Sequence, residues 1–318
     1  MLMVIADPAA PFLKALSVLP AGLEIFVSDD AARLQARAPD ADAILYAGLD
    51  AGLLAKVLPR ANRLRWLHCL WTGVDGLLIP EVIGHPAQFT NGRGVFRTPL
   101  SDWVIAAMLF FAFDLRRVIR QQDHHVWEPF VAHTLAGRTL GIVGYGAIGS
   151  AAASRARPFG MTIAALRRRQ KLFTADSLVD RQYGPGELQE LMSVSDYVLV
   201  ATPLTRETRG LIGETEIAAM RQTSILLNIG RGPVIDESAL IRALEAKKIS
   251  GAALDVFTTE PLPPDHPFWK MSNVLLSPHT ADRVEGFLGP AMECFIENFN
   301  RFSEGVPLLN VVDKDAGY

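Results

Sequence analysis

The sequence predicts an α/β protein built from two doubly wound parallel-sheet domains, and three observations support this prediction. Short apolar runs alternate with amphipathic stretches from the N-terminus onward, as in a parallel sheet whose strands are joined by helices. The alternation stops at a helical pattern over residues 98–120 and begins again at residue 139. The 318 residues also exceed the length of about 250 to 300 at which a single core stops growing.

Four apolar runs are the expected strands of the first domain: LMVIA, EIFVS, AILYAG and LRWLHCL. The helical pattern over 98–120 follows, with Thr98, Pro99 and Ser101 as start signals. This segment is apolar over most of its surface. We therefore expect one buried helix of about twenty residues between the two domains.

Six further runs are the expected strands of the second domain: TLGIV, MTIAAL, DYVLVAT, SILLNIG, SGAALDV and NVLLSPH. A last helical pattern, over residues 285–305, is too short to form a domain and is expected to pack on the first one. The predicted domains are therefore residues 1–97 with 284–318, and residues 98–283. The second would be inserted into the first.

Composition narrows the range of partners. The chain is 49% hydrophobic and 20% charged with a net charge of −3, which is typical of a soluble globular protein and gives no basic footprint for nucleic acid. Cys69 and Cys294 form neither a disulfide framework nor a metal-ligand pattern, so we expect a reducing compartment and no metal. The sequence shows no signal peptide and no apolar run of 18 residues or more. These features predict a cytoplasmic protein without a membrane partner.

A glycine pattern marks a dinucleotide site. Gly144, Gly146 and Gly149 have the G-x-G-x-x-G spacing, directly after an apolar strand and at the start of a small-residue helix. The first glycine allows a tight turn, the second allows close approach of a pyrophosphate, and the third lets the helix lie close to the sheet. Ala147 and Ile148 would open that helix, whose N-terminal N–H groups favour an anion.

Three polar residues stand where strands of the second domain should end: Arg231, Glu260 and His279. Ligands of open α/β sheets bind outside these carboxyl ends, so the three are expected to converge. A guanidinium grips the carboxylate of a 2-keto acid and polarises its carbonyl, and a histidine donates the proton that the reduced carbonyl needs. A carboxylate beside the imidazole stabilises its protonated form.

Together with the glycine loop, these residues resemble the D-2-hydroxyacid dehydrogenase family, as do the stretches LRWLHCLWTGVDGL, NGRGVFRTPLSDWVIAAML and ATPLTRETRGLIGETEIAAMR. The resemblance covers nearly the whole chain. It implies a flavodoxin-like substrate-binding domain at 1–97 and 284–318 and a Rossmann domain at 98–283. It also implies reduction of a small 2-keto acid such as glyoxylate or hydroxypyruvate, with Arg231, Glu260 and His279 in the roles just given.

The resemblance assigns further residues by position. Thr202 and Pro203 match the loop that covers the cofactor, and Asp255 matches a position near the nicotinamide. The LWTGVDG stretch matches the loop that binds the substrate carboxylate, and its expected substrate-binding residues are Trp71, Thr72, Gly73 and Val74. Trp71 is either a core residue or a roof over the substrate pocket. The region around Trp127 matches the family's dimerisation zone, which implies a homodimer.

The stretch AALRRRQ predicts cofactor preference. Arg167 stands 18 positions after Gly149, and alignment with the family places it where NAD-dependent members carry an aspartate that binds the ribose hydroxyls. Arg167 and Arg168 would instead bind a 2′-phosphate, while Arg169 is the expected spectator. The predicted cofactor is therefore NADP(H), with NAD(H) weaker.

Two other functions remain open at this point. The same architecture also serves as a dinucleotide-sensing regulator or corepressor. We would expect a regulator to gain a partner-docking extension, and only a short tail follows the last helical pattern here. A formate dehydrogenase is a third reading, but those enzymes resemble a pattern with an amide beside the histidine. The acidic Glu260 favours protonation of a carbonyl instead.

Overall fold

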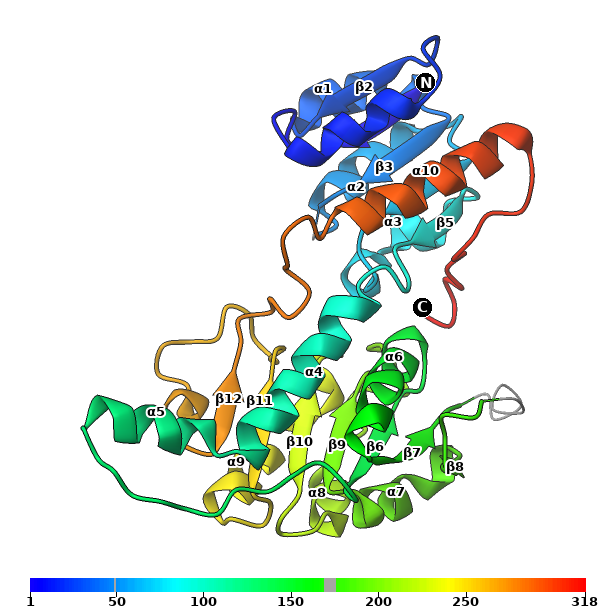
Figure 1. The fold of residues 1–318 in the computed structure, drawn as a ribbon. Helices are drawn as coiled ribbons and strands as arrows, with labels where there is room; N and C mark the ends of the chain where they lie inside the picture. The colour runs from blue at the N-terminus through cyan, green and yellow to red at the C-terminus, as the bar shows by residue number, and fades with distance from the viewer. Residues whose placement is uncertain (49, 169–175) are drawn as a thin grey trace. The chain divides into compact units, whose positions relative to one another are not determined.

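A computed structural model describes residues 1–48, 50–168 and 176–318. The chain divides into two compact units, Met1–Phe96 with Val284–Tyr318, and Arg97–Arg283. The expected limits differ from this division only at Arg97. Figure 1 traces the chain from the first unit into the second and back again.

The first unit contains a five-stranded parallel sheet in the order β2-β1-β3-β4-β5. Its strands are β1 (Leu2–Ile5), β2 (Ile25–Ser28), β3 (Ala43–Tyr46), β4 (Trp66–Cys69) and β5 (Gln88–Asn91). The three central strands are buried along their whole length, which explains their continuous apolar runs. Strand β5 was not among the expected strands because three of the four residues in its sequence, QFTN, are polar.

Four α-helices accompany this sheet: α1 (Ala31–Arg37), α2 (Gly52–Val57), α3 (Pro80–Ile83) and α10 (Gly289–Glu304). The last helix, expected over 285–305, begins four residues later, with Pro290 in its first turn. Its Phe295 ring stacks on Trp66 of β4, with centroids 5.4 Å apart. The C-terminal helix is thus part of the first unit's core.

The second unit contains a seven-stranded parallel sheet in the order β12-β11-β10-β9-β6-β7-β8. The strands are β6 (Thr139–Val143), β7 (Thr162–Leu166), β8 (Arg181–Tyr183), β9 (Tyr197–Val200), β10 (Ile225–Asn228), β11 (Gly251–Leu254) and β12 (Val274–Leu276). Two parallel-sheet α/β units confirm the predicted fold class. The short edge strand β8 went unpredicted because two of its three residues are exposed.

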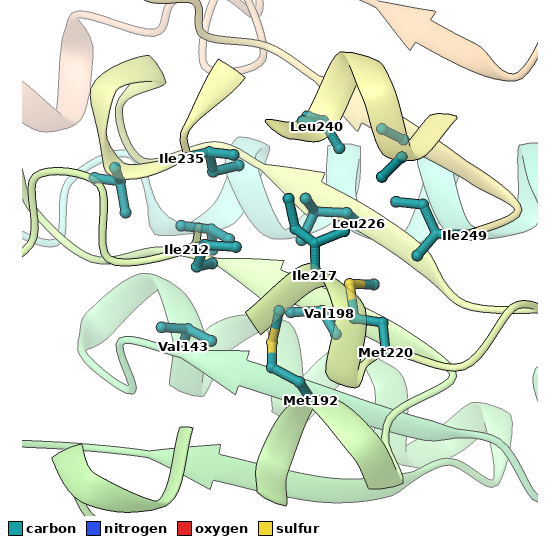
Figure 2. Close-up of a cluster of buried hydrophobic side chains, with 14 of the residues drawn as sticks. Val143, Met192, Val198, Ile212, Ile217, Met220, Leu226, Ile235, Leu240 and Ile249 are labelled. Carbon is teal, nitrogen blue, oxygen red and sulfur yellow. The ribbon is translucent and has the colours of Figure 1, made fainter. Parts of the chain in front are cut away.

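Helices α4 (Arg97–Ala112), α5 (Leu115–Asp123), α6 (Ala147–Ala156), α7 (Leu188–Val194), α8 (Glu214–Ala219) and α9 (Glu237–Glu245) belong to the second unit. Figure 2 shows Val143, Val198 and Leu226 of the sheet among apolar side chains of the flanking helices, including Ile217 of α8 and Leu240 of α9. This core buries the central strands of the sheet. The loops that leave their carboxyl ends therefore start from well-packed strands.

The expected single helix over 98–120 was wrong. It breaks between α4 and α5, which are bent by 64° to each other. Asp114 adopts a left-handed backbone conformation, with φ 44°, and its carboxylate accepts a hydrogen bond from the Arg117 N–H to cap α5. Within the described residues no single helix is long and apolar enough to cross a membrane, and only the bent pair passes that test, by length and composition.

Candidate active site

The turn after β6 has the shape that a dinucleotide loop requires. Gly144 has φ +100°, and a Cβ there would lie 2.7 Å from the Thr202 nitrogen. A Cβ on Gly149 would lie 2.7 Å from the Gly144 oxygen, so only glycine lets α6 pack this closely. Around Gly146, no described atom lies within 4 Å of a built Cβ. That opening leaves room for a ligand beside the backbone.

The start of α6 can hold an anion. Gly146 is the N-cap, and no described side chain bonds to the first-turn N–H groups, which include those of Ala147 and Ile148. Such N–H groups and the helix dipole attract a phosphate. Thr202, against which Gly144 packs, begins the loop after β9 together with Pro203. The residues present therefore fit the pyrophosphate of a dinucleotide.

Two of the three arginines follow β7 within the described chain. The Arg167 N–H donates to the Tyr183 carbonyl of β8 at 3.1 Å, which anchors the backbone at the strand end. Arg168 is exposed, and its Nη1 lies 2.8 Å from Oε2 of Glu207, in the loop after β9. Arg169 lies outside the described residues. Asp176 begins the next described stretch, and its carboxylate accepts a hydrogen bond from Tyr145 of the glycine turn at 2.8 Å.

Arg231 follows β10 in a tightly packed turn. Its carbonyl accepts a hydrogen bond from Asn228 Nδ2 at 3.1 Å, and Asn228 Oδ1 accepts one from the Gly230 N–H at 3.0 Å. A Cβ on Gly232 would lie 1.9 Å from the carbonyl carbon of Phe257. The turn that carries Arg231 is thus pressed against the loop that leads to Glu260.

Glu260 and His279 form a direct pair. His279 Nδ1 lies 2.7 Å from Oε2 of Glu260, and Oε1 accepts a hydrogen bond from the Phe257 N–H at 2.9 Å. Because Nδ1 is engaged, Nε2 is the ring nitrogen left to face a substrate. Both side chains are partly exposed.

The charges around this pair favour an imidazolium beside a carboxylate. The hydrogen bond to Glu260 raises the pKa of His279, against the opposing effect of burial and of the Arg231 charge. Burial alone would raise the pKa of Glu260, but hydrogen bonds from His279 and Phe257 outweigh it and leave that pKa below its usual value. The positive charge of Arg231 also lowers the pKa of Glu260. The structure therefore brings the three predicted residues into one electrostatic cluster.

Asp255, expected beside the nicotinamide, holds the loop that carries His279. Its side chain is buried, and Oδ1 accepts hydrogen bonds from Ser277 Oγ at 2.5 Å, from the Thr280 N–H at 2.9 Å and from the Ala281 N–H at 3.1 Å. Burial raises the pKa of Asp255, and these hydrogen bonds oppose the rise. Sequence reasoning missed Ser277, whose only signal was a hydroxyl two residues before the histidine.

The expected substrate loop lies in the first unit, after β4. Thr72 Oγ1 donates to the Gly92 carbonyl at 2.8 Å, and Asn91 Nδ2 donates to the Thr72 carbonyl at 2.7 Å. Val74 is buried in the core and Gly73 is half-buried. Asn91 was another residue that the sequence analysis missed.

Trp71 is half-buried and firmly held. Its indole N–H lies 3.1 Å from the Ala47 carbonyl and 3.0 Å from the Gly48 carbonyl. The ring stacks with Phe96 and Phe287, at centroid distances of 6.1 and 6.4 Å. These contacts fix the second residue of the LWTGVDG loop within its own unit.

Residues 105–281 match the family described as D-isomer specific 2-hydroxyacid dehydrogenase, NAD binding domain. The chain is 35% identical over 293 residues to the glyoxylate reductase of Korarchaeum cryptofilum, covering 88% of this chain and 85% of that protein. It is 36% identical over 299 residues to the glyoxylate reductase of Aeropyrum pernix, covering 89% and 86%.

A solved structure extends the likeness over the whole chain. The NADPH-dependent glyoxylate/hydroxypyruvate reductase of Sinorhizobium meliloti, in complex with NADP and sulfate, has a TM-score of 0.86 at 26% identity and covers 100% of this chain and 99% of its own. The glycine turn, the cluster of Arg231, Glu260 and His279, and these relatives all indicate the same family. The chain belongs to the D-isomer specific 2-hydroxyacid dehydrogenase family and is an NAD(P)-dependent enzyme.

Proposed function

We propose that this enzyme uses NADPH to reduce a small 2-keto acid, such as glyoxylate or hydroxypyruvate, to the 2-hydroxy acid, with the D configuration where the product is chiral. The observation that carries the proposal is the 2.7 Å pair of His279 and Glu260 within the electrostatic reach of Arg231. Two of the relatives are named glyoxylate reductase, which favours the smallest members of this substrate class.

Arg231 binds and polarises the substrate. Its planar guanidinium can donate to the substrate carboxylate and, through a further N–H, to the neighbouring carbonyl oxygen. The positive charge also stabilises the negative charge that develops on this oxygen as the carbonyl is reduced. The backbone N–H groups around Gly73 and Val74 are the proposed second contact for the carboxylate.

His279 supplies the proton. When bound, a nicotinamide dinucleotide would supply the hydride that the carbonyl carbon accepts. His279 Nε2 gives its proton to the carbonyl oxygen, so that C=O becomes CH–OH. Glu260 keeps the imidazole charged before this transfer and fixes the ring through Nδ1. A histidine that a carboxylate keeps protonated is suited to proton donation, which favours a reductase over a dinucleotide-sensing regulator.

The loop after β7 is the proposed determinant of NADP(H) preference. Arg167 and Arg168 place two guanidinium groups after the strand where an aspartate would repel a 2′-phosphate. Gly144, Gly146, Ala147, Ile148 and Gly149 would hold the pyrophosphate, and the loop at Thr202 and Pro203 would cover the cofactor. Asp255 remains a proposed contact near the nicotinamide, in addition to its hold on the His279 loop.

We further propose a cytoplasmic homodimer. Both cysteines are free thiols, which accords with a reducing compartment. Exposed apolar side chains on α5 and the segment after it form a surface that a second copy would cover: Leu115, Val118, Ile119, Val126, Trp127 and Val131.

Steady-state kinetics with a panel of 2-keto acids test the proposal. Glyoxylate, hydroxypyruvate, pyruvate and phenylpyruvate are assayed with NADPH and with NADH at moderate salt. We expect the highest kcat/KM with glyoxylate or hydroxypyruvate and NADPH. Absence of turnover with every keto acid would contradict the proposed reaction, whereas equal use of NADH would contradict only the cofactor preference.

A further inference from the structure

An ion pair joins two loops of the second unit on either side of the glycine turn. Arg168 follows β7 and Glu207 lies in the loop after β9, and their side chains meet at 2.8 Å. In the sheet, β7 and β9 are the two neighbours of β6, from which the glycine turn leaves (Figure 1). The pair therefore links the two loops that flank the proposed cofactor site.

The Glu207 loop is shaped by its own hydrogen bonds. Thr208 Oγ1 donates to the Pro203 carbonyl at 2.6 Å, and the Thr205 N–H donates to Thr208 Oγ1 at 2.8 Å. The Gly210 N–H donates to the Pro233 carbonyl at 2.8 Å. These bonds hold the loop without help from Glu207, whose carboxylate is thus free to exchange partners while the loop keeps its shape.

Both charged groups are open to solvent. The side chain of Arg168 is 45% exposed and that of Glu207 is 70% exposed. An exposed pair of this kind is weak, typically about 0.2 to 1 kcal/mol, so an incoming anion can replace the carboxylate. A ribose 2′-phosphate carries more charge than a carboxylate and offers three acceptor oxygens to a guanidinium.

We propose that Glu207 determines how tightly the enzyme holds NADP(H). In the absence of cofactor its carboxylate is a partner of Arg168, and the 2′-phosphate takes that place when NADP(H) binds. Glu207 then lowers the affinity for the 2′-phosphate in two ways, since the ion pair must break and a negative charge stays near the phosphate. The inference rests on the proposed NADP(H) preference.

Isothermal titration calorimetry tests this competition. The probes are adenosine 2′,5′-bisphosphate and 5′-AMP, which differ only in the 2′-phosphate. For Glu207→Gln at low ionic strength, we expect the bisphosphate to bind about 1.4- to fivefold more tightly, the factor that corresponds to the cost of an exposed pair. The affinity for 5′-AMP should stay unchanged, and the gain should shrink as salt is added.

Glu214→Gln is the matched control. Glu214 pairs with Arg242 at 3.1 Å in the same unit, and its side chain is 72% exposed. This variant should bind both probes as the wild type does. In the Arg168→Gln background, Glu207→Gln should produce a smaller gain, because only the repulsion between Glu207 and the phosphate is left to remove.

The outcomes separate the alternatives. Weaker binding of the bisphosphate by Glu207→Gln would mean that Glu207 closes over the bound nucleotide, and unchanged binding would mean that the pair plays no part; either overturns the inference. A wild-type protein that binds the two probes equally would overturn both this inference and the NADP(H) preference. Keto-acid turnover is measured separately, so the proposed reaction stands or falls on its own assay.

Discussion

His279 combines an unusual backbone conformation with a directed side chain. Its φ of 51° lies in the left-handed region, which most residues avoid. The His279 N–H donates to the Asp255 carbonyl at 2.9 Å, and the Asp255 carboxylate binds the two N–H groups that follow. A buried acid thus holds the turn in a conformation that aims the imidazole at Glu260.

Replacing His279 by Ala should remove most of the reductase activity. General acid catalysis is worth about 10² to 10⁴ in rate, so we expect kcat to fall within that range. The dissociation constant for NADPH, measured by quenching of protein fluorescence, should change little, because the substitution lies outside the glycine turn. A variant with wild-type kcat would disprove the assignment of the proton donor.

The pH dependence of the reaction should report the His279–Glu260 pair. Keto-acid reduction needs the protonated imidazole, so kcat/KM should fall as pH rises through the pKa of His279. Glu260 raises this pKa above its ordinary value of about 6.5. Glu260→Gln removes the carboxylate and should move the falling limb toward acid.

The loss caused by Glu260→Gln should therefore be larger at about pH 8 than at about pH 6. A pH–rate profile of the variant against the wild type measures this directly. A uniform loss at all pH values would show that Glu260 acts on geometry alone. An unshifted limb with wild-type rates would place it outside the mechanism.

Arg231→Lys should be impaired although the charge is kept. A lysine ammonium cannot bind carboxylate and carbonyl together as the planar guanidinium does. Loss of one charge-assisted hydrogen bond of about 1.5 to 3 kcal/mol corresponds to a fall in kcat/KM of roughly 10- to 150-fold. Arg242→Lys, at an exposed position on α9, is the control and should behave as the wild type. If Arg231→Lys retained wild-type kcat and KM, the residue would not touch the substrate.

At the scale of the element, the chemistry is concentrated in loops that leave the carboxyl ends of the second sheet. The loop after β6 forms the glycine turn, that after β7 carries Arg167, and that after β10 carries Arg231. Parallel strands bring these ends to one edge of the sheet, while the strands themselves stay buried. A substitution in such a loop can change ligand choice with little effect on the core.

Arg167→Asp should reverse the cofactor preference. The guanidinium groups of the β7 loop are expected to favour NADPH over NADH by about 2 to 3 kcal/mol, or roughly 30- to 150-fold in kcat/KM. An aspartate at this position repels the 2′-phosphate and accepts hydrogen bonds from the ribose hydroxyls of NAD(H). The ratio of kcat/KM for the two cofactors, measured with glyoxylate, gives the result. A ratio equal to that of the wild type would exclude Arg167 from the preference.

At the scale of the whole molecule, the apolar surface on α5 and beyond requires an explanation. Trp127 is 94% exposed and Val131 is 88% exposed, although both are large apolar side chains. Contact of large apolar side chains with water is unfavourable, and a contiguous patch of them is typical of an interaction surface. The proposed homodimer would bury them against a second copy.

Trp127→Glu should therefore weaken the dimer. Loss of a central aromatic anchor costs about 2 kcal/mol or more, which is roughly 30-fold in the dissociation constant. Sedimentation equilibrium should show a shift toward monomer. Val18→Glu, which alters an exposed apolar residue of the first unit, is the control and should leave the oligomeric state unchanged. A wild-type protein that is monomeric at all concentrations would contradict the proposal.

Features that depend on neighbours along the chain could be predicted from the amino-acid sequence. Buried parallel strands read as apolar runs because both of their faces are covered, and so the two α/β units were predictable. The glycine turn was predictable because each glycine answers a local steric demand, such as the positive φ of Gly144. Arg231, Glu260 and His279 could be singled out because each follows a recognisable strand.

Contacts between residues distant in sequence could be seen only in the folded structure. The periodicity of a sequence does not say how far apart two separate loops lie in space. The fold was therefore needed to reveal three contacts: the 2.7 Å pair of Glu260 and His279, the hydrogen bonds from Asp255 to the His279 turn, and the Arg168–Glu207 ion pair. The break at Asp114 could not be predicted because the apolar pattern continues through it. The cap that starts the second helix is a hydrogen bond to the Asp114 side chain. Edge strands such as β8 were hidden for the opposite reason, since a half-exposed strand has no apolar run to reveal it.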